Sequence, residues 1–105
     1  PEADTNDLDG WIVVKGKPTM KTQVLHTNKE ETMISGIWEA TPGTYHATYS
    51  AYEFVHIIKG VLKITPDDGT SARIVKAGDT FIVESNFKGT WEIQESVLKH
   101  FDFVL

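Results

Sequence analysis

The chain has 105 residues, no cysteine and a formal net charge of −5. This length suits one domain with its own core, and the lack of cysteine excludes a disulfide framework and a thiolate metal site. Four acidic residues fall within the first nine positions, so we expect residues 1–10 to form a flexible acidic tail and residues 11–105 the domain.

The remainder of the chain is close to neutral, which argues against a nucleic-acid partner, because such partners require a clustered basic surface. No apolar run approaches membrane-spanning length and no secretory signal is present. We therefore expect a cytoplasmic protein with no membrane partner.

Along the chain, short runs of β-branched and aromatic residues alternate with turn residues. The predicted strands, in chain order, are 11–14, 21–26, 33–40, 44–49, 52–59, 61–65, 71–76, 79–84, 90–95 and 97–105. Gly60 ends the fifth of these, and the Pro66–Gly69 turn joins 61–65 to 71–76 as a hairpin. No helical periodicity extends beyond two turns, so the pattern predicts an all-β sandwich or barrel.

Residues 36–69 and 75–101 resemble the small single-domain cupins related to ureidoglycine aminohydrolase and to the ethanolamine-utilisation cupin. The landmarks that carry the resemblance are Trp38, Pro42, Gly43, Glu53, Gly60, Gly78, Asp79, Phe87, Gly89, Trp91 and Lys99. The resemblance implies an RmlC-like jelly-roll barrel of two antiparallel sheets, commonly a homodimer.

Cupins of the general pattern hold a divalent metal with three histidines and a glutamate. With four residues before Glu53, the first two histidine positions fall on His46 and Thr48, and the last falls on Gly89. Because two of the four ligands are missing, we predict no metal cofactor. If a metal does bind, His46 and Glu53 are the ligands that remain.

Alternation along strands predicts which side chains face the barrel interior. Glu53 should point inward with Val55 and Ile57, and the metal pattern implies that His46 and Thr48 do so from the preceding strand. On the last strand the more apolar row contains Lys99, which places a lysine inside. Trp91 shares the parity of Gly89 and should fill the volume left by the missing histidine and metal.

A buried lysine needs a partner, and Glu53 is the obvious one. The pair either stabilises the barrel without doing chemistry, or forms the polar floor of a ligand pocket, while a third alternative has Lys99 reaching to the barrel mouth. Tyr49 and Tyr52 lie near the mouth, where aromatic residues most often pack but also line pockets. The candidate ligand-binding residues are His46, Thr48, Tyr49, Glu53, Trp91 and Lys99.

The favoured function is binding of a small molecule in the barrel beside a degenerate metal site. The alternatives are a metal-dependent cupin enzyme of the lyase, isomerase or aminohydrolase class, and a non-catalytic dimeric module. An interior plugged by side chains would favour the last of these. The outward row Phe54, His56 and Ile58 is too apolar for a water-facing surface, so we expect it to pack against a second subunit.

Overall fold

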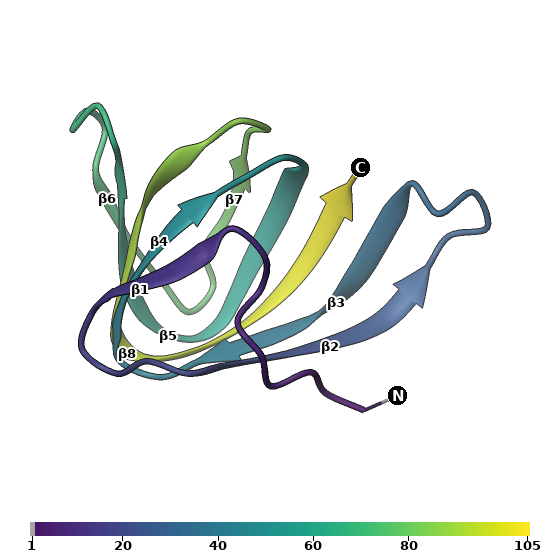
Figure 1. Ribbon diagram of the computed structural model, residues 1–105, viewed down its shortest axis with the longest axis horizontal. Helices are drawn as coiled ribbons and strands as arrows, with labels where there is room; N and C mark the ends of the chain where they lie inside the picture. Colours follow the sequence, from purple (N-terminus) through teal and green to yellow (C-terminus); the bar gives the residue numbers. More distant parts are fainter. Residues whose placement is uncertain (1) are drawn as a thin grey trace.

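The computed structural model describes residues 2–105, which form eight antiparallel strands and no helix. The strands are β1 (Trp11–Lys15), β2 (Met20–Thr27), β3 (Met33–Ala40), β4 (Gly43–Thr48), β5 (Tyr52–Pro66), β6 (Arg73–Lys76), β7 (Thr80–Val83) and β8 (Lys88–Val104). They make one continuous hydrogen-bonded sheet that curls into a half-barrel (Figure 1). The predicted all-β fold is confirmed. No helix within residues 2–105 is long and apolar enough to span a membrane.

Two long strands divide the curled sheet into two facing parts. The first half of β8 pairs with β4 and the second half of β5, and this part, here called sheet I, also contains β1 and β6. The second half of β8 pairs with β3 and the first half of β5, and this part, sheet II, also contains β2 and β7. Both β5 and β8 therefore belong to both sheets.

The two long strands correct the predicted element boundaries. Residues 52–59 and 61–65 were expected as separate strands, as were 90–95 and 97–105, but each pair is one strand, of 15 and 17 residues respectively. The register shifts between Lys59 and Val61, where β5 bends. Gly60 has a φ of 98° at this point. The glycine marks a bend inside a strand, which local turn chemistry does not distinguish from a strand end.

The interior between the two sheets is filled by large side chains. Trp38, Tyr45, Leu62 and Trp91 are fully buried, as are the charged residues Glu53 and Lys99. Val55, Ile57, Val97 and Phe101 are also buried, so the rows predicted to face inward on β5 and on the end of β8 are confirmed. The barrel is thus plugged by its own side chains at the level of Glu53.

The acidic N-terminal segment lies along the edge of sheet II. The backbone of Asp4 exchanges two hydrogen bonds with Thr22 of β2, at 2.7 and 2.8 Å. The hydroxyl of the buried Tyr45 donates a hydrogen bond to Asp7 at 2.9 Å, and Leu8 packs against the core. Although its side chains are mostly exposed, this segment makes specific contacts, and its flexibility stays a prediction.

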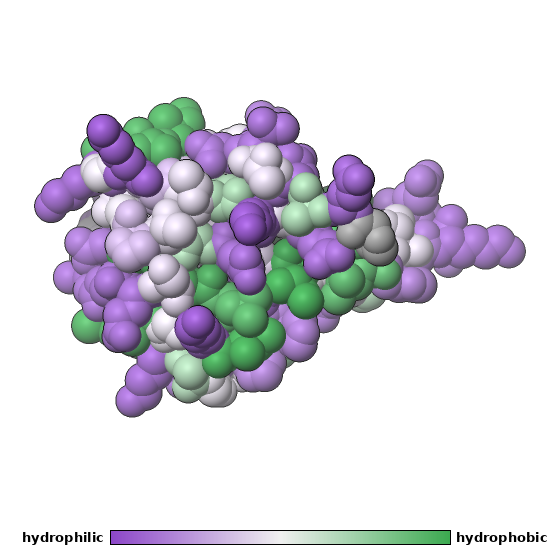
Figure 2. Space-filling model, turned by 90° about the horizontal axis from the view of Figure 1, so that it is seen from below, coloured by the Kyte–Doolittle hydropathy of each residue, from purple (hydrophilic) through white to green (hydrophobic). Residues whose placement is uncertain are grey.

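The outer face of sheet II is apolar where the sequence predicted a subunit contact. Phe54 and Ile58 are 38 % and 37 % exposed, with His56 half-buried between them, so this row does point outward. Ile82 on the neighbouring strand β7 and Leu25 on β2, two strands beyond β8, add exposed apolar area on the same face. Seen from below, the molecule shows a cluster of hydrophobic side chains on this side (Figure 2).

We predict that the bend in β5 depends on glycine at position 60. A Cβ there would lie 2.2 Å from the backbone oxygen of Ser96, and the positive φ disfavours any other residue. Gly60→Ala should lower the free energy of unfolding by roughly 3 kcal/mol or more, at or above the upper end for backbone strain. Gly69→Ala is the matched control, because Gly69 also has a positive φ but faces open space. Urea unfolding that gives equal losses for the two variants would contradict the steric argument.

Candidate functional site

The most unusual feature of the interior is an ion pair that is excluded from water. Lys99 on β8 donates a hydrogen bond from Nζ to Oε2 of Glu53 on β5 at 2.8 Å, and both side chains are at most 1 % exposed. The second oxygen of Glu53 accepts a 2.5 Å hydrogen bond from the hydroxyl of Tyr49, just after β4. The predicted contact between Lys99 and Glu53 is therefore present, and Tyr49 completes a three-residue network.

Aromatic rings surround the lysine on its remaining sides. The Nζ atom lies 4.5 Å from the ring centroids of both Trp38 and Trp91, 5.7 Å from that of Trp11 and 5.9 Å from that of Phe101. These four rings are here called the Lys99 cage. A desolvated ammonium over an indole face gains about 2 kcal/mol, which helps to offset the loss of its hydration. Trp91 thus points inward, as predicted, and packs beside the pair.

The cage joins the two sheets. Trp11 comes from β1 and Trp91 from the first half of β8, both in sheet I, whereas Trp38, Glu53 and Lys99 belong to sheet II. The three indoles also pack on one another, with ring centroids 5.1 to 5.9 Å apart. Trp11 was not predicted as a site residue. Its place at the start of an apolar run gave no signal beyond core packing.

Burial sets the electrostatics of this network. Desolvation lowers the pKa of Lys99 from its ordinary value, and the charge and hydrogen bond of Glu53 act in the opposite direction. Desolvation, followed by the charge and hydrogen bond of Glu53, raises the pKa of Tyr49 well above 10. Tyr49 therefore remains a hydrogen-bond donor throughout the physiological pH range.

His46 and Thr48 do not point into the barrel, and this corrects the prediction from the metal pattern. Tyr45, Ala47 and Tyr49 form the buried row, so the residues between them face outward. The assumed four-residue spacer before Glu53 is one residue too long for this chain, because a three-residue spacer places the two positions on Ala47 and Tyr49. Burial of two tyrosine rings fixes this orientation of the strand.

The residues do not fit a metal centre of the cupin pattern. The Nε2 atom of His46 lies 3.0 Å from both carboxylate oxygens of Asp67 on the outside, while both oxygens of Glu53 are engaged inside. At Gly89 a Cβ would lie 2.5 Å from the backbone oxygen of Thr65, so a histidine cannot be placed there without moving β5. Within residues 2–105 no three histidine, aspartate or glutamate side chains gather in a metal-binding group.

A pocket of about 210 Å³ opens next to the network and is here called the mouth pocket. Leu8, Trp11 and Phe103 supply apolar walls, Asp9, Thr48 and Ser50 supply polar groups, and Tyr49 also lines the pocket. Trp11 and Tyr49 therefore belong both to this pocket and to the buried network. Of the predicted ligand-binding residues, the structure brings Thr48 and Tyr49 to this pocket and leaves Glu53, Trp91 and Lys99 beneath it.

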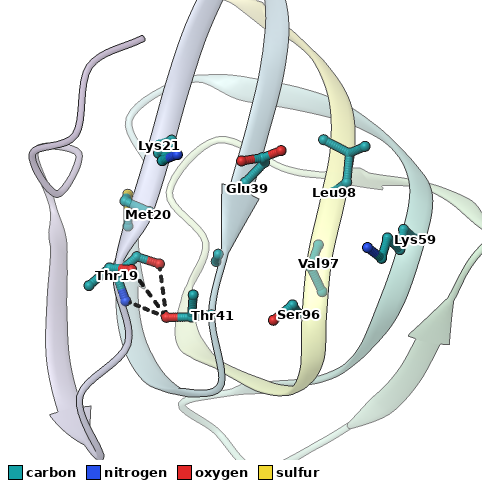
Figure 3. A pocket seen from close by; sticks show the side chains of 10 residues that line it. Thr19, Met20, Lys21, Glu39, Thr41, Lys59, Ser96, Val97 and Leu98 are labelled. Carbon is teal, nitrogen blue, oxygen red and sulfur yellow. Dashed lines mark hydrogen bonds between the residues drawn. The ribbon is translucent and has the colours of Figure 1, made fainter.

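A larger hollow of about 320 Å³ lies at the bend of β5 and β8 (Figure 3). Its side chains come from β2, β3, β5 and β8 and their ends, and Thr19 and Thr41 are hydrogen-bonded to each other there. Lys21, Glu39 and Lys59 are exposed, and none of the predicted site residues lines this hollow. We regard the mouth pocket as the better candidate of the two, because its wall residue Tyr49 connects it to the buried Glu53 and Lys99.

Residues 27–101 match the EutQ-like cupin domain family. The chain belongs to this family. No curated protein sequence shows significant similarity to it. Among solved structures, EutQ from Clostridium difficile is 18 % identical, with a TM-score of 0.71 over 83 % of this chain and 68 % of that one.

Two further structures share the fold. A protein of unknown function of the DUF861 family from Pseudomonas syringae pv. tomato is 21 % identical, with a TM-score of 0.82 over 99 % of this chain and 45 % of that one. Ectoine synthase from P. lautus is 15 % identical, with a TM-score of 0.71 over 96 % of this chain and 68 % of that one. At such identities the likeness establishes the cupin fold and no activity.

The ion pair makes a quantitative prediction for paired substitutions. Lys99→Met leaves the Glu53 carboxylate buried without its opposite charge and still hydrogen-bonded to Tyr49, so it should cost about 3–5 kcal/mol of unfolding free energy. Adding Glu53→Gln removes that stranded charge, so the double variant should be more stable than the sum of the two single losses predicts. Urea unfolding of all four proteins measures the coupling, and strictly additive losses would show that the pair does not exist.

The raised pKa of Tyr49 predicts a loss of stability at high pH. Above pH 10 the unfolded chain releases the Tyr49 proton while the folded protein keeps it, so the stabilisation is complete below pH 10 and lost above it. The expected slope is about 1.4 kcal/mol per pH unit for each such group. In Tyr49→Phe the fall in unfolding free energy between pH 10 and 11.5 should be shallower by this amount. Parallel curves for wild type and variant would refute the assignment.

Proposed function

We propose that this cupin domain binds a small organic molecule in the mouth pocket. The observation that carries the proposal is the double role of Tyr49, whose ring lines the pocket while its hydroxyl is fixed by Glu53. A pocket with aromatic walls and a few anchored polar groups is typical of small-molecule sites. Because the interior is filled, the ligand sits above the Lys99 cage.

The pocket walls indicate what kind of molecule would fit. Trp11 and Phe103 offer aromatic surfaces, and Asp9 places an exposed carboxylate at the rim. A flat or aliphatic body that carries a hydrogen-bond donor or a positive charge matches this combination. We infer binding rather than proton transfer by Glu53, because this carboxylate is fully buried and both of its oxygens already accept hydrogen bonds, from Tyr49 and Lys99.

The test is a thermal-shift screen of small metabolites against the whole chain, since a specific ligand raises the midpoint by mass action. A bound compound should lose its effect in Ser50→Trp, which obstructs the pocket from an exposed loop position. It should keep its effect in Lys59→Trp, a matched change in the hollow at the β5 bend. A compound whose effect is lost only in Lys59→Trp would place the site at the bend instead.

A second candidate function, a non-catalytic dimeric module, is favoured by the plugged interior and the apolar outer face of sheet II. We propose that a second copy of the chain covers this face. A shallow hollow lined by Leu25, Gly36, His56 and His100 lies beside the exposed Phe54 ring. A two-fold arrangement would allow Phe54 of each subunit to enter the hollow of the other.

Light scattering at micromolar concentration should therefore give twice the mass of one chain. Phe54→Glu places a charge in the contact and should reduce the mass to that of a monomer. Ile74→Glu is the control, since Ile74 is 61 % exposed on β6 of the other sheet and its substitution should leave the dimer intact. A wild-type monomer, or dissociation by the control alone, would disprove this interface.

A further inference from the structure

The surroundings of the Lys99 ammonium have the composition of a binding site for a free ammonium ion. Two indole faces lie 4.5 Å from Nζ, and a third indole and a phenyl ring lie within 6 Å. The Glu53 carboxylate accepts a hydrogen bond from Nζ at 2.8 Å. Proteins recognise alkylated ammonium ligands with this combination of aromatic faces and a nearby negative charge. Here the side chain of the protein itself occupies the site.

The walls of the cage also have contacts that do not involve Lys99. Trp11, Trp38 and Trp91 come from three different strands and pack against one another edge to face or tilted. Glu53 is held independently by the hydroxyl of Tyr49. If the lysine side chain is shortened, the aromatic walls and the carboxylate therefore have other contacts that keep them in place.

The site also discriminates between kinds of cation. Without the lysine side chain it offers four aromatic faces and the one carboxylate oxygen that Lys99 now occupies, whereas a divalent metal needs several oxygen or nitrogen ligands. Trp91 Nε1 is buried without a hydrogen-bond partner in the described part of the chain and is a donor, so it adds no ligand for a metal. An alkylammonium ion needs only the faces and the one oxygen.

We propose that the barrel interior is an ammonium-binding cage that Lys99 occupies in the native protein, and that it accepts a free primary alkylammonium ion when this side chain is removed. This inference goes beyond the proposed ligand at the mouth and does not rest on it. It assigns Lys99 the role of a built-in ligand that keeps the cage closed.

The experiment uses Lys99→Ala and n-propylammonium chloride. This substitution removes Cγ, Cδ, Cε and Nζ, the four heavy atoms that n-propylammonium supplies. We expect a saturable rise of about 5 °C or more in the unfolding midpoint of the variant, and none in the wild-type protein, whose cage is filled. 1-Propanol, the neutral analogue of the same length, should give at most a quarter of this shift.

Two controls separate binding in the cage from a general salt effect. Lys99→Met refills the cage with a neutral chain and should not respond to n-propylammonium. Lys99→Ala combined with Glu53→Gln keeps the cavity but removes its charge, so its preference for n-propylammonium over 1-propanol should disappear. Equal shifts in Lys99→Ala and Lys99→Met, or equal shifts by the amine and the alcohol in Lys99→Ala, would overturn the proposal.

Lys99→Ala on its own could fail to fold, and the proposal stays testable in that case. Refolding of the variant from urea with and without n-propylammonium should then give folded protein only with the amine, measured by near-ultraviolet circular dichroism of the buried tryptophans. Failure to fold under both conditions counts against the proposal. Independently, nitrogen-15 spectra of the wild-type lysine ammonium groups should show one slowly exchanging, ring-shifted signal. Loss of that signal in Lys99→Met assigns it, and its absence from the wild-type spectrum would refute an occupied cage.

Discussion

The structure is organised around the burial of one positive charge. The Lys99 ammonium is almost completely removed from water, and the loss of hydration costs several kcal/mol unless other groups replace it. Glu53 supplies the opposite charge, the indoles of Trp38 and Trp91 supply two negative ring faces, and Tyr49 satisfies the oxygen of Glu53 that Lys99 leaves free. Each of these groups is therefore constrained by the others.

The long, bent strands make this arrangement possible. Trp91 and Lys99 are eight residues apart on β8, yet they belong to different sheets and meet across the interior because the strand bends between them. On β5 the same bend requires Gly60, where the backbone passes too close to Ser96 for any side chain. The curl of the sheet and the composition of the cage thus have a common origin in the two strands that both sheets share.

The sequence predicted the strand content, the buried ion pair and the inward position of Trp91. These predictions rest on period-two alternation within single strands, where the apolar row of residues 97–103 leaves only one side for Lys99. The sequence misplaced His46 and Thr48, because the orientation of β4 relative to Glu53 depends on a loop whose length changes the parity. It also divided β5 and β8 at their bends. In β5 a glycine at a bend has the same local signature as a glycine at a turn, and in β8 the exposed polar pair Glu95 and Ser96 interrupts the apolar alternation.

Trp11 could not be assigned from the sequence for a different reason. Its ring meets Trp38, Trp91 and Lys99 only because β1 pairs with β4, a contact between residues more than thirty positions apart. Alternation within one strand contains no information on such pairings, which depend on how the whole sheet closes.

Trp11 and Tyr49 belong both to the mouth pocket and to the buried network around Lys99. This double role would limit how a ligand binds in the mouth pocket. A ligand that displaces the Tyr49 ring would also remove one of the two hydrogen bonds to the buried Glu53 carboxylate. Leaving that oxygen unpaired costs about 1–3 kcal/mol or more, which the ligand would have to compensate with new contacts. The proposed site would therefore favour ligands that bind without displacing the Tyr49 ring. The mouth pocket is therefore expected to select ligands by their shape, because the hydrogen bond from Tyr49 to the buried Glu53 fixes one of its walls.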